Sequence, residues 1–138
     1  MILSSLDQIS WLGVLVSVVV FAGLGALYFM VLVPRQYLAA LGRQDAPPAP
    51  RRTVDAVGPL VTTVLLVLTS AVLVAALDLQ TVTDAVVFGV LVGVGYLVSM
   101  TFTIAINPNF PHPIRYGLLN TPYFLLGSVI TAVLLVVL

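Results

Sequence analysis

The chain has 138 residues, of which 61% are hydrophobic and 7% charged, and its formal net charge is zero. A soluble domain carries roughly 25% charged residues and could not bury so much apolar surface at this size, so the lipid bilayer is the expected surrounding of most of the chain. Without cysteine or lysine, disulfides, thiolate metal sites and Schiff bases are excluded. The single His112 and the scattered arginines also argue against a histidine-bound metal, any cofactor and a nucleic-acid partner.

The first predicted span covers residues 11–33, which carry no charge. At 1.5 Å per residue this run reaches roughly 34 Å, enough to cross a bilayer core of about 30 Å. Trp11 is placed to anchor it at the interface, and Pro34 ends it. The following loop, 34–56, contains a segment with amphipathic helical spacing and then a proline-rich linker.

The second and third spans are predicted over 57–77 and 82–106. Asp55 is a candidate cap for the second, with Pro59 in its first turn. Thr81 and Asp84 stand three residues apart, as in a capping box, so a helix should begin near residue 82. It should stop at Asn107, because the residue before a proline is pushed out of the helical region.

The fourth span is predicted over 116–138, and the sequence leaves its start open. If Thr121 is the cap and Pro122 the first helical residue, few residues are left to cross the membrane. If the helix begins near Tyr116, Pro122 must lie inside it and kink it.

All the arginines fall in the loop 34–56 or between the third and fourth spans. The charged residues of the N-terminus and of the second loop are all acidic. The positive-inside rule then places loop 34–56 in the cytoplasm and both termini outside it. The prediction is one all-α domain, an antiparallel bundle of four transmembrane helices in the cell (cytoplasmic) membrane. Arg35 and Arg115 are expected to contact lipid at the interface.

Small and polar residues recur at helical spacing along the first, third and fourth spans, including a GxxxG in the third. Helices in lipid associate through such faces, so these residues are predicted to form packing seams or to line a pocket. They are Gly25, Tyr28, Gly89, Gly93, Tyr96, Thr103, Asn107, Asn120, Tyr123 and Gly127. Asn107 and Asn120 are further expected to bond the carbonyl groups that Pro108 and Pro122 leave free.

Two short motifs carry a resemblance to a known family. The first span has Gly-Ala-Leu-Tyr-Phe at 25–29, followed by Gly42. Asn107, Phe110 and Pro113 precede an Asn-Thr-Pro-Tyr at 120–123. In these motifs the chain resembles a family of small bacterial four-helix membrane proteins catalogued as a conserved domain of unknown function. It departs from that pattern in lacking a proline soon after residue 29 and in a shorter 107–123 hairpin, and the resemblance implies an architecture but no activity.

Three functions remain open from the sequence. Small-residue seams and absent catalytic groups favour a non-catalytic protein, either a homo-oligomer or an accessory subunit bound to another integral membrane protein. An alternative is an uncoupled channel or carrier, lined by Tyr28, Tyr96, Thr103, Asn107, Asn120 and Tyr123. A second alternative is an enzyme acting on a lipophilic substrate through His112, Arg115, Asn120 and Tyr123. Every Asp and Arg falls outside the uncharged runs 11–33, 57–77, 85–106 and 116–138 of the four spans, which argues against proton-coupled transport.

Overall fold

The structure is a computed structural model that describes residues 3–138. Within that range it contains helices and no strand. The elements are the 3₁₀-helix η1 (Leu3–Gln8), α1 (Trp11–Leu27) with its π-helical continuation η2 (Tyr28–Leu32), α2 (Pro34–Ala40), α3 (Thr53–Ala76), α4 (Val82–Val92), the π-helix η3 (Gly93–Val98), α5 (Ser99–Ala105) and α6 (Pro113–Val137).

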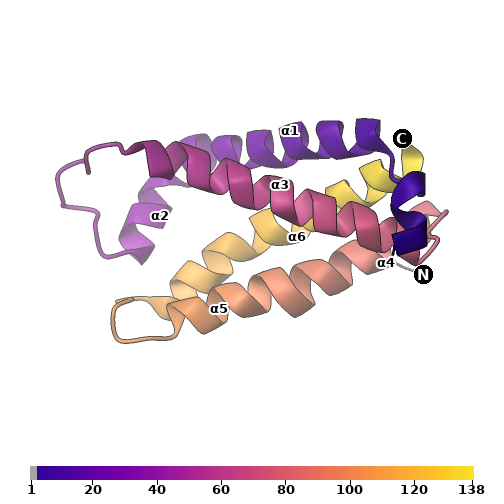
Figure 1. The fold of residues 1–138 in the computed structure, drawn as a ribbon. Helices are drawn as coiled ribbons and strands as arrows, with labels where there is room; N and C mark the ends of the chain where they lie inside the picture. The colour runs from indigo at the N-terminus through magenta and orange to yellow at the C-terminus, as the bar shows by residue number, and fades with distance from the viewer. Residues whose placement is uncertain (1–2) are drawn as a thin grey trace.

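Four helical segments are long and apolar enough to cross a membrane: Trp11–Leu32, Thr53–Ala76, Val82–Ala105 and Pro113–Val137. The predicted class, an all-α membrane protein, is confirmed. Both termini lie at one end of the bundle, which we call the terminal end (Figure 1). Helix α2, the loop from α2 to α3 and the loop from α5 to α6 lie at the other end of the bundle. We call it the arginine end, because all the arginines are in or next to these segments.

The second span begins earlier than residue 57. Helix α3 starts at Thr53 because its first turn is closed by Asp55, whose Oδ2 accepts a 2.9 Å hydrogen bond from the main-chain N–H of Arg52. Asp55 is therefore the third residue of the helix and not its cap, and Pro59 lies beyond the first turn.

Helix α6 is longer than predicted and runs unbroken through Pro122. It begins at Pro113, where a proline costs no hydrogen bond. Thr121 is not a cap, and its hydroxyl donates to the carbonyl of Gly117 at 2.9 Å.

The third span follows the prediction at its start, because Thr81 caps α4 and its Oγ accepts from the N–H of Asp84 at 3.1 Å.

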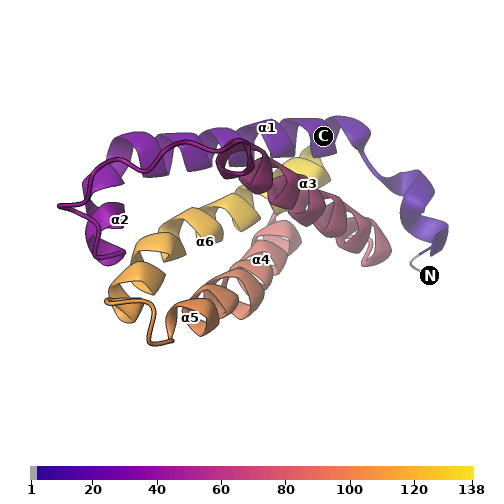
Figure 2. The ribbon, with the colours of Figure 1, turned by 60° about the vertical axis from the view of Figure 1, so that its left-hand side comes forward.

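Helix α6 is the central element of the bundle. It contacts α1, α3, α4 and α5 and also reaches α2, and it lies between α1 and the α4–α5 segment (Figure 2). Its buried residues, from Gly117 to Leu135, are mostly small or polar. Such residues permit close helix approach in lipid.

The packed apolar core lies toward the terminal end. Val14 of α1, Val67, Ala71 and Val74 of α3, and Leu135 of α6 form this cluster. Val67 is fully buried. The three helices are therefore in tight contact in this half of the bundle.

Candidate functional site

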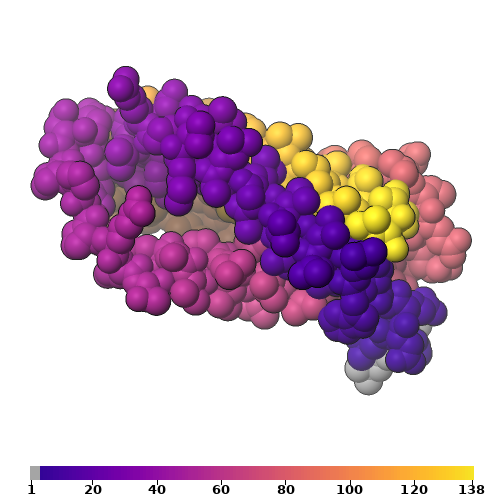
Figure 3. Space-filling model, turned by 90° about the horizontal axis from the view of Figure 1, so that it is seen from above, coloured from indigo at the N-terminus to yellow at the C-terminus, as the bar shows by residue number. Residues whose placement is uncertain are grey.

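A large cavity lies between α1 and α3 in the half of the bundle nearer the arginine end, and we call it the α1–α3 cavity. Its volume is about 860 Å³. Figure 3 shows the surface hollowed between the purple and magenta segments on this side. Residues of α1, η2, α2, α3, η3 and α6 line it: Phe21, Ala22, Gly25, Ala26, Phe29, Met30, Tyr37, Asp55, Ala56, Gly58, Pro59, Leu60, Thr62, Thr63, Leu66, Leu97, Asn120, Tyr123 and Phe124.

The cavity exists because α1 and α3 meet only toward the terminal end. There, the core around Val67 fills the space between them. Toward the arginine end, α1 contributes small residues such as Ala22 and Ala26, and α3 contributes Ala56 and Gly58. Small side chains cannot bridge the gap, so the two helices leave an open space with α6 behind it.

Aromatic rings form the wall on the α6 side. The ring of Tyr123 lies edge-on to those of Phe21 and Phe29, with centroids 5.2 and 5.1 Å apart. Phe29 in turn contacts Tyr37 of α2 at 5.2 Å. Edge-to-face packing at these separations is favourable beyond the area it buries, so the wall is a rigid apolar surface.

The π-helical end of the first span is tied to α6. The hydroxyl of Tyr28 donates a 2.8 Å hydrogen bond to the main-chain carbonyl of Leu119. Gly25 allows this approach, because a Cβ there would lie 3.0 Å from the hydroxyl of Tyr123. Both residues thus fix the position of the wall relative to α1.

Two polar side chains on α6 face the cavity with unused hydrogen-bonding capacity. Asn120 is only 3% exposed, and its Nδ2 donates to the carbonyl of Tyr116 at 2.8 Å. Its Oδ1 accepts no hydrogen bond from any group in residues 3–138. The Tyr123 hydroxyl also forms no hydrogen bond with a group in that range. The cavity therefore presents the Asn120 acceptor, the Tyr123 hydroxyl and, from α3, the Thr63 hydroxyl, which also forms no hydrogen bond within residues 3–138, in a mostly apolar lining.

The lining carries little charge. Asp55 is its only acidic residue, and that carboxylate is held by Arg52, with Nη2 3.0 Å from Oδ1. Burial, and secondarily Tyr116, raise the pKa of Tyr37 well above its ordinary value, so this tyrosine stays neutral. No arginine lines the cavity within the described range.

The structure brings together four of the predicted residues. Gly25, Asn120 and Tyr123 line the cavity, and Tyr28 stacks against Tyr123 with centroids 6.3 Å apart. Gly127 lies deeper on α6, where a Cβ would come within 2.5 Å of the Phe21 ring. These residues form one continuous contact between α1 and α6.

Gly89 and Gly93 belong to a separate seam between α4–η3 and α6. A Cβ at Gly89 would lie 2.5 Å from Cα of Val129, and one at Gly93 would overlap Ser128. The hydroxyl of Ser128 donates to the carbonyl of Gly89 at 2.8 Å. The GxxxG is thus used within the protomer, where it lets two backbones approach.

Within the protomer, this seam does not continue through Tyr96 and Thr103. Tyr96 is 74% exposed and Thr103 is also exposed, whereas Phe102 faces α6 and overlaps any Cβ at Gly117. The reason is η3, because a π-helical turn holds about one extra residue and rotates the following helix. The hydroxyl of Ser99 bonds Val94, five residues back, in keeping with that geometry.

Asn107 has the role predicted for it, and Asn120 does not. The Asn107 amide donates to the carbonyl of Ile104, the group that an N–H at position 108 would have bonded. Asn120 instead bonds Tyr116, whereas the proline at 122 frees the carbonyl of residue 118.

The residues predicted for a channel or an enzyme do not share one site. Tyr96, Thr103 and Asn107 lie outside the lining of the α1–α3 cavity. His112, at the start of α6, and Arg115 are both exposed and also lie outside it, as does the exposed Arg35. Only Asn120 and Tyr123 of the predicted enzyme set reach the cavity.

Sequence reasoning missed the contribution of α3. Ala56, Gly58, Thr62 and Thr63 line the cavity, yet this span was treated as plain apolar helix. The sequence carries no signal for this role, because small and hydroxyl-bearing residues are equally frequent in the two halves of the helix.

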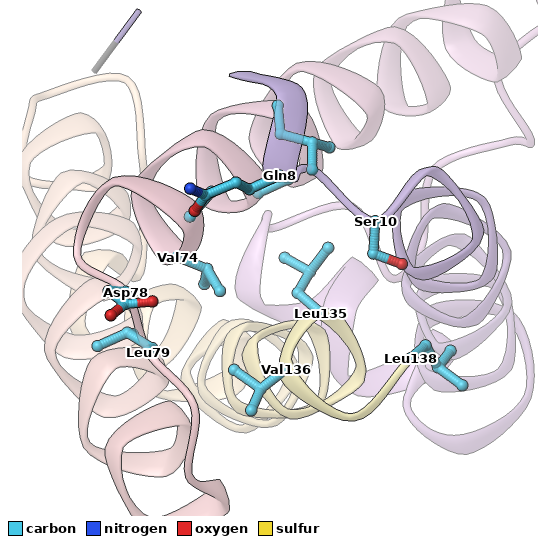
Figure 4. A pocket seen from close by; sticks show the side chains of 11 residues that line it. Gln8, Ser10, Val74, Asp78, Leu79, Leu135, Val136 and Leu138 are labelled. Carbon is cyan, nitrogen blue, oxygen red and sulfur yellow. The ribbon is translucent and has the colours of Figure 1, made fainter. Parts of the chain in front are cut away.

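A second, smaller cavity of about 250 Å³ lies at the terminal end. Figure 4 shows Gln8, Ser10 and Asp78 around it, with the apolar side chains of Val74 and Leu135 between them. Two of its polar groups are engaged locally, because Asp78 accepts from Gln80 at 2.9 Å and Ser10 accepts from the N–H of residue 13 at 3.0 Å.

Comparison with known sequences gives one match. The model of a family described as "Protein of unknown function (DUF1761)" covers residues 12–136. No curated protein and no solved structure matches the chain. The match includes all four candidate spans almost completely and confirms the resemblance to a domain of unknown function.

Proposed function

Because the chain belongs to the DUF1761 family, whose description states no activity, we propose a function from the α1–α3 cavity: a non-catalytic integral membrane protein that binds a lipophilic molecule. The observation that carries this proposal is a cavity of about 860 Å³ with an aromatic wall, placed between two spans. Binding sites for small molecules have about 300–1,000 Å³ and a mainly apolar lining with a few polar groups.

The terminal half of the bundle favours a binding site over a channel. Beyond Thr63 and Leu66 the space between α1 and α3 is filled by the core around Val67, which is fully buried. A molecule entering from the arginine end or from the lipid would therefore stop halfway across. Catalysis also lacks support, because His112 and Arg115 lie outside the lining.

An alkyl-diazirine photoprobe tests this proposal in lipid nanodiscs. Labelling of the cavity residues on α1 and α3 should saturate as the probe concentration rises, whereas labelling of lipid-facing residues should rise linearly. Ala22→Phe fills the cavity and should abolish the saturable part. Gly23→Phe is the control, because a Cβ at Gly23 meets nothing within 4 Å. Linear labelling throughout the wild-type protein would refute the proposal.

A second function, a homo-oligomer or an accessory subunit, is favoured by the exposed face at Gly95 and Tyr96. Tyr96 is 74% exposed, and a Cβ at Gly95 would meet nothing within 4 Å. Tyr96 lies roughly 21 Å along its span, so its hydroxyl, which bonds no group within residues 3–138, would face hydrocarbon. A second copy covering this face would supply a hydrogen-bond partner for the Tyr96 hydroxyl.

Native mass spectrometry from nanodiscs tests this second function. It should show dimers that Gly95→Leu disrupts, and detection of single protomers alone would argue against the homo-oligomer.

A further inference from the structure

The polar groups of the α1–α3 cavity restrict the chemistry of its ligand, and this step rests on the proposed binding function. We infer that the cavity selects an uncharged amphiphile whose ring-shaped head carries a hydroxyl group, with an apolar tail extending toward the lipid. Alkylphenols and the reduced, quinol form of isoprenoid quinones share this chemistry.

The hydroxyl requirement comes from Asn120 and Tyr123. The Asn120 amide is oriented by its bond to the Tyr116 carbonyl, so Oδ1, an acceptor only, is the atom left free. The Tyr123 hydroxyl can donate or accept. A ligand hydroxyl can donate to Asn120 Oδ1 and accept from Tyr123, whereas an ether or ketone can only accept and leaves Oδ1 without a donor.

An acceptor that faces the cavity without a donor explains why the hydroxyl should matter. The Asn120 side chain is 3% exposed and lines the cavity, so a ligand that fills the cavity without donating to Oδ1 removes that atom from solvent and leaves it unpaired, at a cost of about 1–3 kcal/mol. A pocket built to bond a hydroxyl discriminates strongly against analogues that lack it.

The absence of charge on the head follows from the lining. Within the described range, no arginine or histidine lines the cavity, and the single carboxylate, Asp55, would repel an anion. That carboxylate is already paired with Arg52 at 3.0 Å, so it offers little to a cation. The ring shape follows from Phe29 and Tyr123, whose edge-to-face contact provides surfaces on which a planar head can stack.

Three probes with twelve-carbon chains test the inference on the full chain in nanodiscs. They are 4-dodecylphenol, its methyl ether 1-dodecyl-4-methoxybenzene, and the anion dodecanoate. Affinity is expressed per mole fraction of probe in the lipid, so that partitioning does not enter. The phenol should bind saturably and about tenfold more tightly than the ether. Dodecanoate should bind more weakly than the phenol.

Two substitutions assign the effect to residues. Tyr123→Phe removes only the hydroxyl and should weaken phenol binding about 3- to 10-fold. Tyr96→Phe makes the same chemical change on the exposed face, outside the cavity, and should leave binding unchanged. Asn120→Leu should reduce phenol binding to the level of the ether, and circular dichroism with thermal unfolding checks that this variant folds.

The outcomes separate the two proposals. Saturable binding of all three probes with equal affinity, or tighter binding of dodecanoate, would overturn the hydroxyl-ring inference and leave the lipophile site in place. No saturable binding of any probe, together with linear photolabelling, would overturn both. Loss of the phenol preference in Tyr96→Phe but not in Tyr123→Phe would also contradict the assignment.

Discussion

The hydroxyl of Tyr28 donates a 2.8 Å hydrogen bond to the main-chain carbonyl of Leu119, which joins the π-helical end of the first span to α6. Leu119 immediately precedes Asn120, the buried polar residue of the cavity. The bond therefore positions the wall of the cavity as well as stabilising the bundle.

Replacing Tyr28 with phenylalanine should keep the ring packing and lose this bond. The expected loss of stability is about 0.5–1.5 kcal/mol, measured by thermal unfolding in mild detergent. Thr103→Val is the control and should change stability less, since the Thr103 hydroxyl is exposed and bonds only along its own span, to the carbonyl of Ser99 at 3.0 Å. Equal stability of the two variants would show that the Tyr28 hydroxyl contributes nothing.

Gly127 is expected to tolerate no side chain. A Cβ there would lie 2.5 Å from the Phe21 ring, so Gly127→Ala should cost about 1–3 kcal/mol through overpacking. In Gly23→Ala the added methyl meets nothing, and better helix propensity should raise stability by up to about 1 kcal/mol. The midpoint of thermal unfolding should therefore fall in Gly127→Ala and rise in Gly23→Ala.

Ser128 makes a hydrogen bond across helices, to the carbonyl of Gly89. Ser128→Ala should lower stability by about 0.6 kcal/mol, an average value for such bonds in membranes. Thr69→Ala removes a hydroxyl that bonds only within its own helix, to Leu65, and should change stability less. The contact between α4 and α6 is tested by denaturant titration of both variants.

Gly42 carries two constraints at once. Its φ is +66°, and a Cβ would lie 2.8 Å from Cγ of Pro111, which lies in the other loop at the arginine end. Gly42→Ala should therefore lose at least about 1 kcal/mol from the backbone alone. Adding Pro111→Ala to Gly42→Ala should restore the stability lost through the contact with Pro111 but not the stability lost through the positive φ. A double-mutant cycle measures the coupling between the two positions. Additive effects would show that the two loops do not touch.

The predicted orientation can be tested directly because the chain has no cysteine. Gln44→Cys lies in the loop 34–56 and Gln80→Cys in the short loop at the terminal end, and both positions are exposed. With the arginine end in the cytoplasm, a membrane-impermeant maleimide added to intact cells should label position 80 and not position 44. The reverse pattern would place both termini in the cytoplasm.

Span positions follow from the sequence because length and the absence of charge are local properties. Residues 11–33 were predicted for the first span and Trp11–Leu32 is found. The capping pair Thr81 and Asp84 fixed the start of α4 for the same reason. At Thr53 the prediction erred, because an arginine as cap residue with Asp55 three positions later is an uncommon pair.

The faces of the third span could not be predicted past Gly93. Counting in steps of 3.6 residues assumes regular α-helix, and η3 violates that assumption, so Tyr96 is exposed where the spacing predicts a packed residue, and Phe102 faces α6 instead. The α1–α3 cavity was likewise out of reach, because it depends on where two helices separate, and residue spacing within one helix does not encode that. Asn120 and Tyr123 were nevertheless identified, since a polar pair beside a proline in an apolar run is visible without coordinates.

The central position of α6 has a consequence for biogenesis. This helix follows the other three spans in the chain, so the ribosome delivers it after α1, α3 and α4–α5 have been made. Each of those helices packs against α6 more extensively than the first and third spans pack against one another. Gly89 of α4 and Gly117 of α6 both lie where the third span contacts α6. The third span, α4–α5, must therefore wait in the bilayer without a packed partner, although α1 and α3 can already contact each other, and the bundle closes only when its last helix inserts.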